Sequence, residues 1–509
     1  MPLLVIFFGT TVNFVYSQAT SQENLSQEIQ KLTAAMARTQ TQLEESQRQL
    51  DAMRKQLSEL QRQMAQSGAN AATQSASASS SSSQAEPEAT SAAIQDIRER
   101  QAMQASQIAT QDQSKVESAS KYPIKVTGLL LLNGFVNTSA VDMAATPTVA
   151  LSGSGSTGAS VRQTLIGIDA RGPHLFGARS YADLRVDFDG SPASDGSTTY
   201  SGYNANAPWL RLRTAHAGLQ WGHTEAYFSF DRPVFSPDAP ASLTAVAIPA
   251  LAWSGNLWTW NPQVGINQDF GLADSLGIRL QAALIDVGDP SLSPPAPASG
   301  ITTTTPPNSA EESRWPGVEA RIKLLGSTGN SNNDHNHIGI GGYFAPHYSS
   351  FLGHGFNSWA GTLDARLVLP ARLEFTGNFY RGQALGGLGG GAYKDFVYKR
   401  DPDSTKYYFR PLDDVGGWIQ LKERLSERLE FNTAFGIDNA FAKELRSYAV
   451  PGGTTYQNLS RNHTYTGNVI YSPSAYLQFS VEYRSLESFP VIGLPARSNI
   501  IGLGAGYKF

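Results

Sequence analysis

Segments in which apolar and polar residues alternate strictly recur from residue 122 to the C-terminus. Clear examples are 181–189 (YADLRVDFD), 318–324 (VEARIKL) and 477–484 (LQFSVEYR). Successive side chains of an extended strand point to opposite faces, so each segment has one face without charge and one that carries charges of both signs. The pattern therefore predicts β-strands whose two faces meet different surroundings.

About sixteen such strands can be placed, an even number, which single-chain bacterial outer-membrane barrels also have. They span residues 122–138, 161–171, 179–189, 208–217, 223–232, 258–270, 276–287, 315–325, 336–346, 356–369, 371–383, 412–425, 429–439, 462–472, 475–486 and 498–509. Short connections such as 220–222 and 473–474 alternate with long ones such as 140–160 and 384–411. Short periplasmic turns and long outer loops are typical of membrane barrels.

The last predicted strand, 498–509 (SNIIGLGAGYKF), has an apolar face that ends in Tyr507 and Phe509. It resembles the C-terminal strand of bacterial outer-membrane proteins. In a closed barrel such a strand pairs with the first strand and leaves no open edge. A soluble sandwich would also show alternation with a period of two. The terminal Phe, the alternation of short and long connections and an export segment instead favour a transmembrane antiparallel β-barrel, which would span residues 121–509.

The first residues have the character of an export signal. The apolar run 3–16 is too short and too interrupted for a membrane-spanning helix, and the small residues Val15 and Ser17 indicate cleavage before Gln18. No later segment reaches the roughly 18 apolar residues that such a helix needs. We therefore interpret residues 1–17 as a signal peptide.

Residues 18–66 have a heptad pattern, with seam residues alternately four and three positions apart over about five heptads. A helix packed on its own domain is the alternative, but the narrow seam favours a self-associating coiled coil, as a dimer or a trimer. The seam residues are Leu25, Ile29, Leu32, Met36, Leu43, Leu50, Met53, Leu57, Leu60 and Met64. Residues 67–120 form a linker rich in Ser, Ala and Gln, with a marginal helix.

Composition narrows the function classes. The chain has no Cys, which excludes a disulfide scaffold and a Cys-based metal site, and its net charge of −4 gives no support for nucleic-acid binding. The motif DHNH at 334–337 is typical of a solvated turn, and the glycines at 386–391 lack the strand-to-helix context of a phosphate cradle. We expect no metal, no cofactor and no enzymatic activity.

Two stretches carry a resemblance to a known family. Residues 162–189 have a basic strand, a short turn and an acidic strand before a long loop. In 210–237 a strand with the motif Arg-x-Arg leads to a strand that ends near Asp and Pro, and NPQVGINQ follows at 261–268. With the leading coiled coil, these stretches resemble the trimeric sixteen-stranded DcaP-like porins; the phosphate-selective porins share a similar stretch. The resemblance implies a homotrimer in contact with outer-membrane lipid, with a periplasmic coiled coil, through which small hydrophilic solutes diffuse passively.

The resemblance also implies a third outer loop that folds into the barrel and narrows it. That loop would be 233–257, which is unusually rich in Ala, Leu and Trp for an exposed connection. An ordinary surface loop is the alternative. The candidate constriction residues in or beside the loop are Asp231, Arg232, Asp238, Trp253 and Trp258.

Charged residues on the polar faces of the strands are candidates for pore lining. The basic ones are Arg162, Arg185, Arg211, Arg213, Arg279, Arg321, Lys323, Arg366 and Arg372, and the acidic ones are Asp183, Asp187, Glu319, Asp364 and Glu374. Rows of cations lower the entry barrier for anions, which predicts a preference for small anions such as carboxylates. Alternatively, the opposite charges pair across strands and stiffen the wall.

Three function classes remain. An outer-membrane porin is favoured. The second is a structural or envelope-tethering barrel with a plugged lumen, whose coiled coil contacts peptidoglycan or another partner. The third is an outer-membrane enzyme with a catalytic cluster at the rim of the barrel.

Overall fold

The computed structural model describes residues 123–509 apart from 191–208, 274–275, 291–306, 327–335, 405, 450 and 452–454. The predicted signal peptide, coiled-coil seam and linker lie outside the described residues. Within the described part of the chain, no helix is long and apolar enough to cross a membrane.

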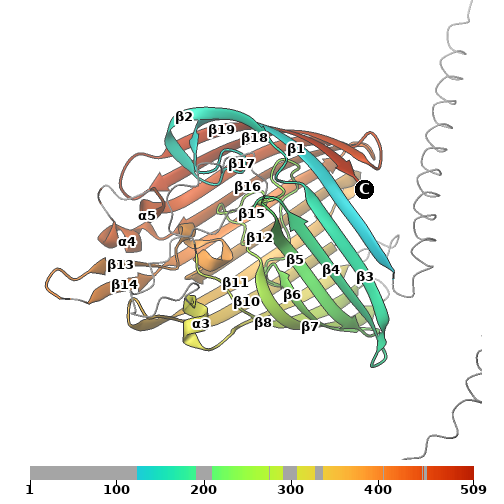
Figure 1. The fold of residues 1–509 in the computed structure, drawn as a ribbon, viewed down its shortest axis with the longest axis horizontal. Helices are drawn as coiled ribbons and strands as arrows, with labels where there is room; N and C mark the ends of the chain where they lie inside the picture. The colour runs from blue at the N-terminus through green and yellow to red at the C-terminus, as the bar shows by residue number, and fades with distance from the viewer. Residues whose placement is uncertain are drawn as a thin grey trace, which may run out of the picture. The chain divides into compact units, whose positions relative to one another are not determined.

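Antiparallel strands that follow one another along the chain make up most of the fold (Figure 1). The strands are β1 (Ile124–Val141), β2 (Ala150–Ser160), β3 (Leu165–Leu175), β4 (Ala178–Asp187), β5 (Arg211–Gln220), β6 (Thr224–Asp231), β7 (Asn261–Ala273), β8 (Leu276–Ile285), β9 (Gly317–Gly326), β10 (Asn336–Ser349), β11 (His354–Val368), β12 (Leu373–Gln383), β13 (Phe396–Arg400), β14 (Tyr407–Pro411), β15 (Asp413–Arg424), β16 (Leu429–Ala440), β17 (Leu459–Tyr471), β18 (Leu477–Pro490) and β19 (Ala496–Lys508). The connections contain α3 (Ser309–Ser313), α4 (Ala442–Leu445), α5 (Thr455–Asn458) and the 3-10 turns η1 (Pro370–Arg372), η2 (Gly386–Leu388), η3 (Gly391–Tyr393) and η4 (Arg446–Tyr448).

Seventeen of these strands form one continuous sheet. β2 pairs with the second half of β1 and β3 with its first half, so the two strands share one position in the wall, interrupted at residues 161–164. Seventeen strands therefore occupy sixteen positions. β1 also pairs with β19, which closes the sheet. The predicted closed, sixteen-stranded antiparallel barrel is confirmed.

The closing contact joins the two ends of the barrel sequence. The backbone N–H of Gly128 donates to the carbonyl of Phe509 at 2.9 Å, and the N–H of Phe509 donates to the carbonyl of Gly128 at 3.1 Å. A Cβ atom on Gly128 would lie 2.3 Å from the ring of Phe509, so only glycine leaves room for the terminal aromatic ring. Tyr507 pairs with Leu130 in the same ladder.

All sixteen predicted strands coincide with strands of the barrel, but the long connections hold more structure than the sequence indicated. β2 lies within the predicted loop 140–160 and is built from Ser, Gly, Ala and Thr, so it lacks the apolar alternation that marks the other strands. The hairpin of β13 and β14 lies within the predicted loop 384–411 and belongs to a separate two-stranded sheet.

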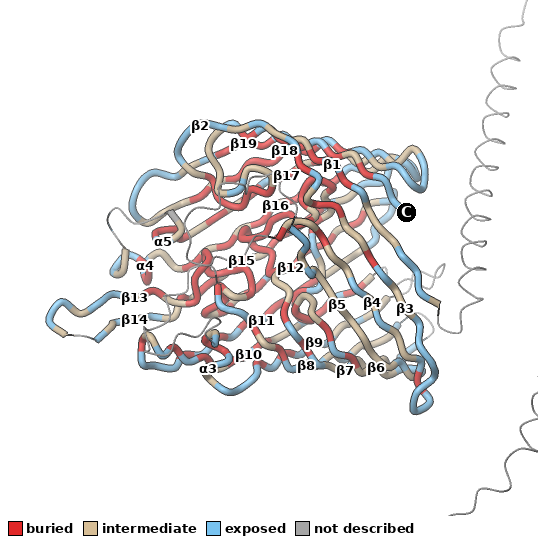
Figure 2. The backbone as a smooth tube through the Cα atoms, in the orientation of Figure 1, coloured by how far each residue is buried: buried red, intermediate tan, exposed pale blue. Residues whose placement is uncertain are grey.

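The two faces of the wall differ in burial (Figure 2). Large apolar side chains on the outward face are exposed, among them Phe228, Val264, Ile340 and Leu503. Inward-facing polar side chains on β10 to β19 are instead mostly buried, which requires that other parts of the chain cover them from inside.

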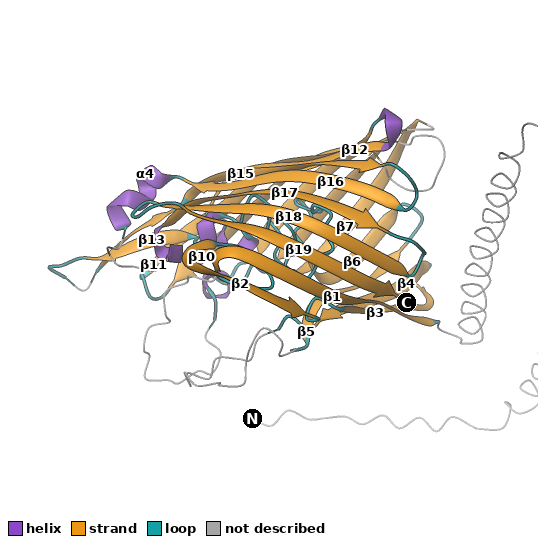
Figure 3. Cartoon of the chain, turned by 90° about the horizontal axis from the view of Figure 1, so that it is seen from above, coloured by secondary structure: helices purple, strands orange, loops and turns teal. Residues whose placement is uncertain are grey.

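The connections differ between the two ends of the barrel. Figure 3 shows α4 and the hairpin of β13 and β14 at one end and the C-terminus at the other. Turns at the end of the barrel where the C-terminus lies, such as residues 221–223 and 425–428, are short. The opposite end of the barrel carries the long connections. We call the end with the long connections the outer end.

Candidate pore and its inward loop

Residues 233–260, in the connection between β6 and β7, lie against the inner face of the barrel, and we call this segment the inner loop. It starts at the wall of β9 and β11. The backbone N–H of Val234 donates to the Glu319 carboxylate at 2.8 Å, and the Thr362 hydroxyl donates to the carbonyl of Phe235 at 2.9 Å. Glu319, predicted as a pore-lining acid, therefore holds a backbone segment.

The inner loop then reaches the opposite side of the wall. The N–H of Ala241 donates to Gln420 of β15 at 2.6 Å, and the Ser242 hydroxyl donates to Glu482 of β18 at 2.5 Å. The Asn133 side chain of β1 donates to the carbonyl of Leu243 at 2.9 Å. Side chains from strands far apart in the sequence thus bind consecutive residues of one loop.

The loop next passes the wall between β1 and β5. Gln163, in the break between β2 and β3, donates to the carbonyl of Thr244 at 3.0 Å and accepts the N–H of Val246 at 2.7 Å. Arg211 donates to the carbonyl of Ala247 at 2.9 Å, and Arg213 donates to the carbonyl of Val246. Two predicted pore arginines therefore also hold the loop.

Inward-facing glycines make room for this path. A Cβ atom on Gly504 of β19 would lie 3.2 Å from Leu243, and one on Gly502 would lie 3.0 Å from Thr244. On the facing wall, a Cβ atom on Gly341 of β10 would lie 2.6 Å from Phe235. The glycine face of the C-terminal strand is thus a contact surface for the inner loop.

A second segment, residues 385–395, lies inside the outer end and is joined to the inner loop. The N–H of Trp258 donates to the carbonyl of Leu388 at 3.0 Å, and the Thr259 hydroxyl donates to the carbonyl of Gly387 at 2.9 Å. Trp253 and Tyr393 stack with ring centroids 3.9 Å apart. The predicted constriction residues Trp253 and Trp258 therefore join two loops in an apolar cluster.

Buried charges hold the second segment in place. Asp414 accepts the N–H of Gly391, and Asp438 accepts the N–H of Ala392, each at 2.7 Å. The Lys394 ammonium donates to three backbone carbonyls, those of Ala392, Tyr456 and Leu459. Burial lowers the pKa of Lys394 to about 7, although Asp438 and Asp414 raise it. The backbone N–H groups of the glycine-rich motif at 386–391 thus donate hydrogen bonds to carboxylates of the protein itself.

The predicted basic residues lie on inward-facing positions of the wall, with Arg372 as the exception. Arg372 lies in the exposed turn η1, because β12 begins at Leu373, two residues later than the predicted strand 371–383 in which Arg372 was expected to face the lumen. Arg211 binds Asp187 through two hydrogen bonds of 2.9 and 2.6 Å, and Arg213 lies 3.7 Å from the same carboxylate. Arg321 binds Asp364, and Arg366 lies 3.1 Å from Glu374.

Several partners were not identified from the sequence. Arg185 pairs with Asp169 at 2.5 Å, Arg279 pairs with Asp269 at 2.6 Å, and Arg162 lies 3.5 Å from Asp189. The neighbours of Asp169 on β3 are Ile168 and Ala170, so the alternation of that strand could have indicated an inward carboxylate. The alternative in which charges pair across the wall thus describes much of the inner face.

The paired charges are not equally accessible. The side chain of Arg211 is 25% exposed and that of Arg213 is 18% exposed, whereas Asp187 between them is fully buried. Arg366 is 32% exposed beside Glu374 at 8%. In these pairs the cation faces the open space and the carboxylate lies behind it.

The inner face has a covered side and an accessible side (Figure 2). Inward polar side chains such as Asn378, Gln420 and Asn468 are buried beneath the two loops. Several inward side chains of β4 to β6, among them Asp183, Arg185 and His216, are half-exposed, whereas Asp187 and Tyr227 are buried. We call the inner face of β3 to β8 the accessible wall.

Comparisons with known proteins agree with this architecture. The outer membrane channel DcaP of Acinetobacter baumannii superposes with a TM-score of 0.53 over 77% of this chain and 99% of that chain, at 14% sequence identity. The barrel therefore has a DcaP-like fold. The anion-selective porin from Comamonas acidovorans (TM-score 0.44, 8% identity, 76% of this chain and 100% of that chain) and the Salmonella typhi OmpF complex with daunomycin (0.45, 11%, 76% and 98%) are also similar. No family model and no curated relative matches the sequence.

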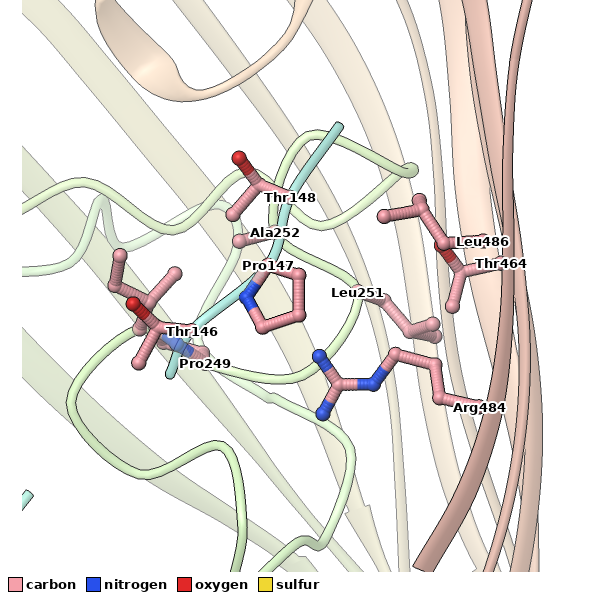
Figure 4. A pocket seen from close by; sticks show the side chains of 10 residues that line it. Thr146, Pro147, Thr148, Pro249, Leu251, Ala252, Thr464, Arg484 and Leu486 are labelled. Carbon is pink, nitrogen blue, oxygen red and sulfur yellow. The ribbon is translucent and has the colours of Figure 1, made fainter. Parts of the chain in front are cut away.

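A small polar cavity remains inside the DcaP-like barrel, between the inner loop and the connection after β1 (Figure 4). It has room for about one water molecule. The guanidinium of Arg484 points toward Pro147 and Leu251 at this cavity and binds Glu482 at 2.6 Å. The cavity therefore suits a buried water rather than a solute.

Asp238, His337 and Asp364 meet where the inner loop touches the wall of the DcaP-like barrel, with ligand atoms within 4.8 Å of one another. His337 lies 3.1 Å from Asp238 and 3.4 Å from Asp364. Arg321 already binds both oxygens of Asp364, at 2.9 and 2.5 Å, which supplies the positive charge that a metal would bring. We interpret the cluster as an anchor of the loop.

Proposed function

We propose that this protein is an outer-membrane porin through which small hydrophilic solutes diffuse passively. The observation that carries the proposal is the path of the inner loop, which covers one side of the barrel interior and leaves the charged accessible wall on the other. Porins of this size are polar inside, whereas a barrel filled by a core would have an apolar interior. The half-exposed side chains of the accessible wall support a water-filled path along β3 to β8.

The inner loop would be the constriction. Arg232 donates to the carbonyl of Asp238 at 2.8 Å, and its neighbour Asp231 ends β6 on the accessible wall. These three residues would border the narrow part of the path. Trp253 and Trp258 would fix the loop through their apolar contacts rather than meet the solute.

Small anions such as carboxylates would be favoured over cations. Most inward-facing arginines are paired with a carboxylate, so few charges of the inner wall are unbalanced. Ion selectivity, however, depends on the charges that are exposed to a passing solute. Arg211 and Arg213 stack against the ring of Trp260 and remain 25% and 18% exposed, while the Asp187 carboxylate between them is fully buried. Exposed cations above buried carboxylates lower the energy of an entering anion.

The barrel would associate as a homotrimer in the outer membrane. On the outward face, Ala182 of β4 lies directly opposite Ala217 of β5 in the ladder, and Ala215 of β5 lies opposite Leu184. Small residues let protein surfaces approach closely within a bilayer. β1 begins at the end with short turns, which supports a periplasmic location for the predicted coiled coil and, with it, contact with peptidoglycan.

A structural barrel with a plugged lumen is the second candidate, because buried polar side chains line a large part of the inner wall. Conductance of the purified protein in a planar bilayer distinguishes the two. We expect open channels in groups of three, with a reversal potential in a KCl gradient that indicates a preference for Cl⁻. A folded barrel without conductance would refute the porin and favour the plugged barrel, and a preference for K⁺ would refute anion selectivity alone.

A further inference from the structure

The lipid-facing wall contains an apolar groove with a volume of about 390 Å³, which we call the outer groove. It crosses β12, β15, β16, β17 and β18. Its lining includes Ile419, Tyr465 and Tyr483, each about half exposed, so it opens to the outside of the barrel.

Two small residues form the floor of the outer groove. Thr433 of β16 and Gly467 of β17 lie directly opposite each other, and Leu421 of β15 flanks Thr433. One step toward the outer end, Phe435 and Tyr465 form a raised edge, with ring centroids 4.5 Å apart. A side chain at Gly467 would meet only a backbone oxygen at 3.9 Å, so the depression results from missing side chains and not from a curved backbone.

A charged cluster lies next to this edge, toward the outer end of the same strands. The ring of His463 lies 5.8 Å from that of Tyr465, and its Nε2 lies 2.9 Å from Glu487. Arg461 stacks over Phe489 at 4.0 Å, and Arg497 donates to Ser485 at 3.1 Å. Glu487 thus pairs with the imidazole of His463 and lies directly opposite Arg497 in the ladder, and Arg461 lies two residues from His463, on a surface that faces away from the lumen.

The position of the charged cluster along the strands matches the depth at which lipid headgroups of the outer leaflet lie. β17 starts at Leu459, directly after a long outer connection, so Arg461 and His463 lie near the outer end of that strand. Aromatic and basic side chains are typical of the boundary between hydrocarbon and headgroups, and basic side chains there attract anionic lipids. The outer groove lies one to two residue pairs deeper, where acyl chains begin.

We propose that the outer groove and the charged cluster form a binding site for a phosphorylated lipid of the outer leaflet. An acyl chain would lie over Thr433 and Gly467, and the phosphate would bind Arg461 and Arg497. Charge complementarity favours this occupant over a second copy of the chain. A flat contact between copies would fit the facing alanines Ala182 and Ala217, whereas the outer groove has a raised aromatic edge.

Native mass spectrometry of the purified full chain with added bis-phosphorylated lipid A tests the proposal. We expect the wild type to retain this lipid in preference to phosphatidylcholine. Gly467→Leu fills the groove and should abolish retention. Gly361→Leu is the matched control, because Gly361 also lies exposed on the outward face, with nothing within 4 Å of an added Cβ atom, but outside the groove. Replacement of Arg461 and Arg497 by Gln should weaken retention about fivefold for each charge.

Three results would overturn the proposal. Retention of lipid A by Gly467→Leu at the wild-type level would show that the groove holds no chain. Equal retention of lipid A and phosphatidylcholine would show that the cluster recognises no phosphate. A change in subunit number in Gly467→Leu, but not in Gly361→Leu, would show that a second copy occupies the groove.

Discussion

Single residues of the inner wall decide which charge a solute meets. Ion pairs with one buried and one exposed partner are neutral overall but present only the exposed partner to the lumen. The arrangement around Asp187 is of this kind, with Arg211 and Arg213 in front of a fully buried carboxylate. The electrostatics of the pore therefore depend on burial as much as on the sum of charges.

Removal of the exposed charges should reduce anion selectivity. We expect the triple variant R211Q/R213Q/D187N to lower the Cl⁻/K⁺ permeability ratio severalfold, because each charge at ~4 Å contributes about 1 kcal/mol even in water. Asp187 is neutralised as well, since a buried carboxylate without a partner would cost about 3–5 kcal/mol. The reversal potential in a KCl gradient measures the change. R372Q, in the exposed turn, is the control, and an unchanged ratio in the triple variant would contradict the proposed selectivity.

At the scale of elements, the inner loop is held by side chains of the wall at its start, middle and end. Glu319, Gln420 and Gln163 bind backbone groups of the loop, and Glu482 accepts a hydrogen bond from the Ser242 hydroxyl, so the position of the loop does not depend on packing alone. A buried backbone N–H without a partner is costly, which makes each anchor sensitive to substitution.

Glu319 offers a direct test of this anchoring. We expect E319A to leave the N–H of Val234 without its acceptor and to destabilise the seated loop by about 1–3 kcal/mol. Channel recordings should then show frequent current fluctuations. E319Q retains a carbonyl oxygen as acceptor and should behave much more like the wild type. Equal fluctuations in both variants would mean that the charge of Glu319 matters and not its hydrogen bond.

At the scale of the whole barrel, different parts of the outward face have different side-chain sizes. In one outward ladder pair, β4 and β5 present Ala182 and Ala217, whereas β9, β15 and β18 present Ile322, Ile419 and Val481. Small residues let protein surfaces approach closely within a bilayer, so Ala182 and Ala217 are the proposed contact between copies.

Enlarging the small residues should dissociate the oligomer. We expect A182L/A217L to yield monomers that retain the barrel fold and single-channel conductance, because the two alanines are opposite each other on the outward face. Light scattering of the purified protein measures the subunit number. A320L changes an exposed outward alanine of β9 and should leave the oligomer intact; loss of the trimer in both variants would contradict the assigned contact.

The sequence by itself determined the strands, their number and the closed barrel. A side chain in a strand must face either lipid or the interior, so the alternation along 181–189 or 477–484 records the two environments directly. The same rule placed Arg211, Arg321 and Asp364 on the inner face. The rule failed at β2, because its small Ser and Gly residues are tolerated both toward lipid and toward the interior and therefore give no apolar alternation.

Only the tertiary structure decided the contents of the barrel. The glycines of the C-terminal strand were readable as a small face, but their contact with Leu243 and Thr244 depends on a loop more than 250 residues earlier in the chain. Likewise, Glu319 was recognisable as an inward acid, yet its partner is a backbone N–H and not an arginine. Contacts between distant segments follow from the path of the chain in space, and no local pattern encodes that path.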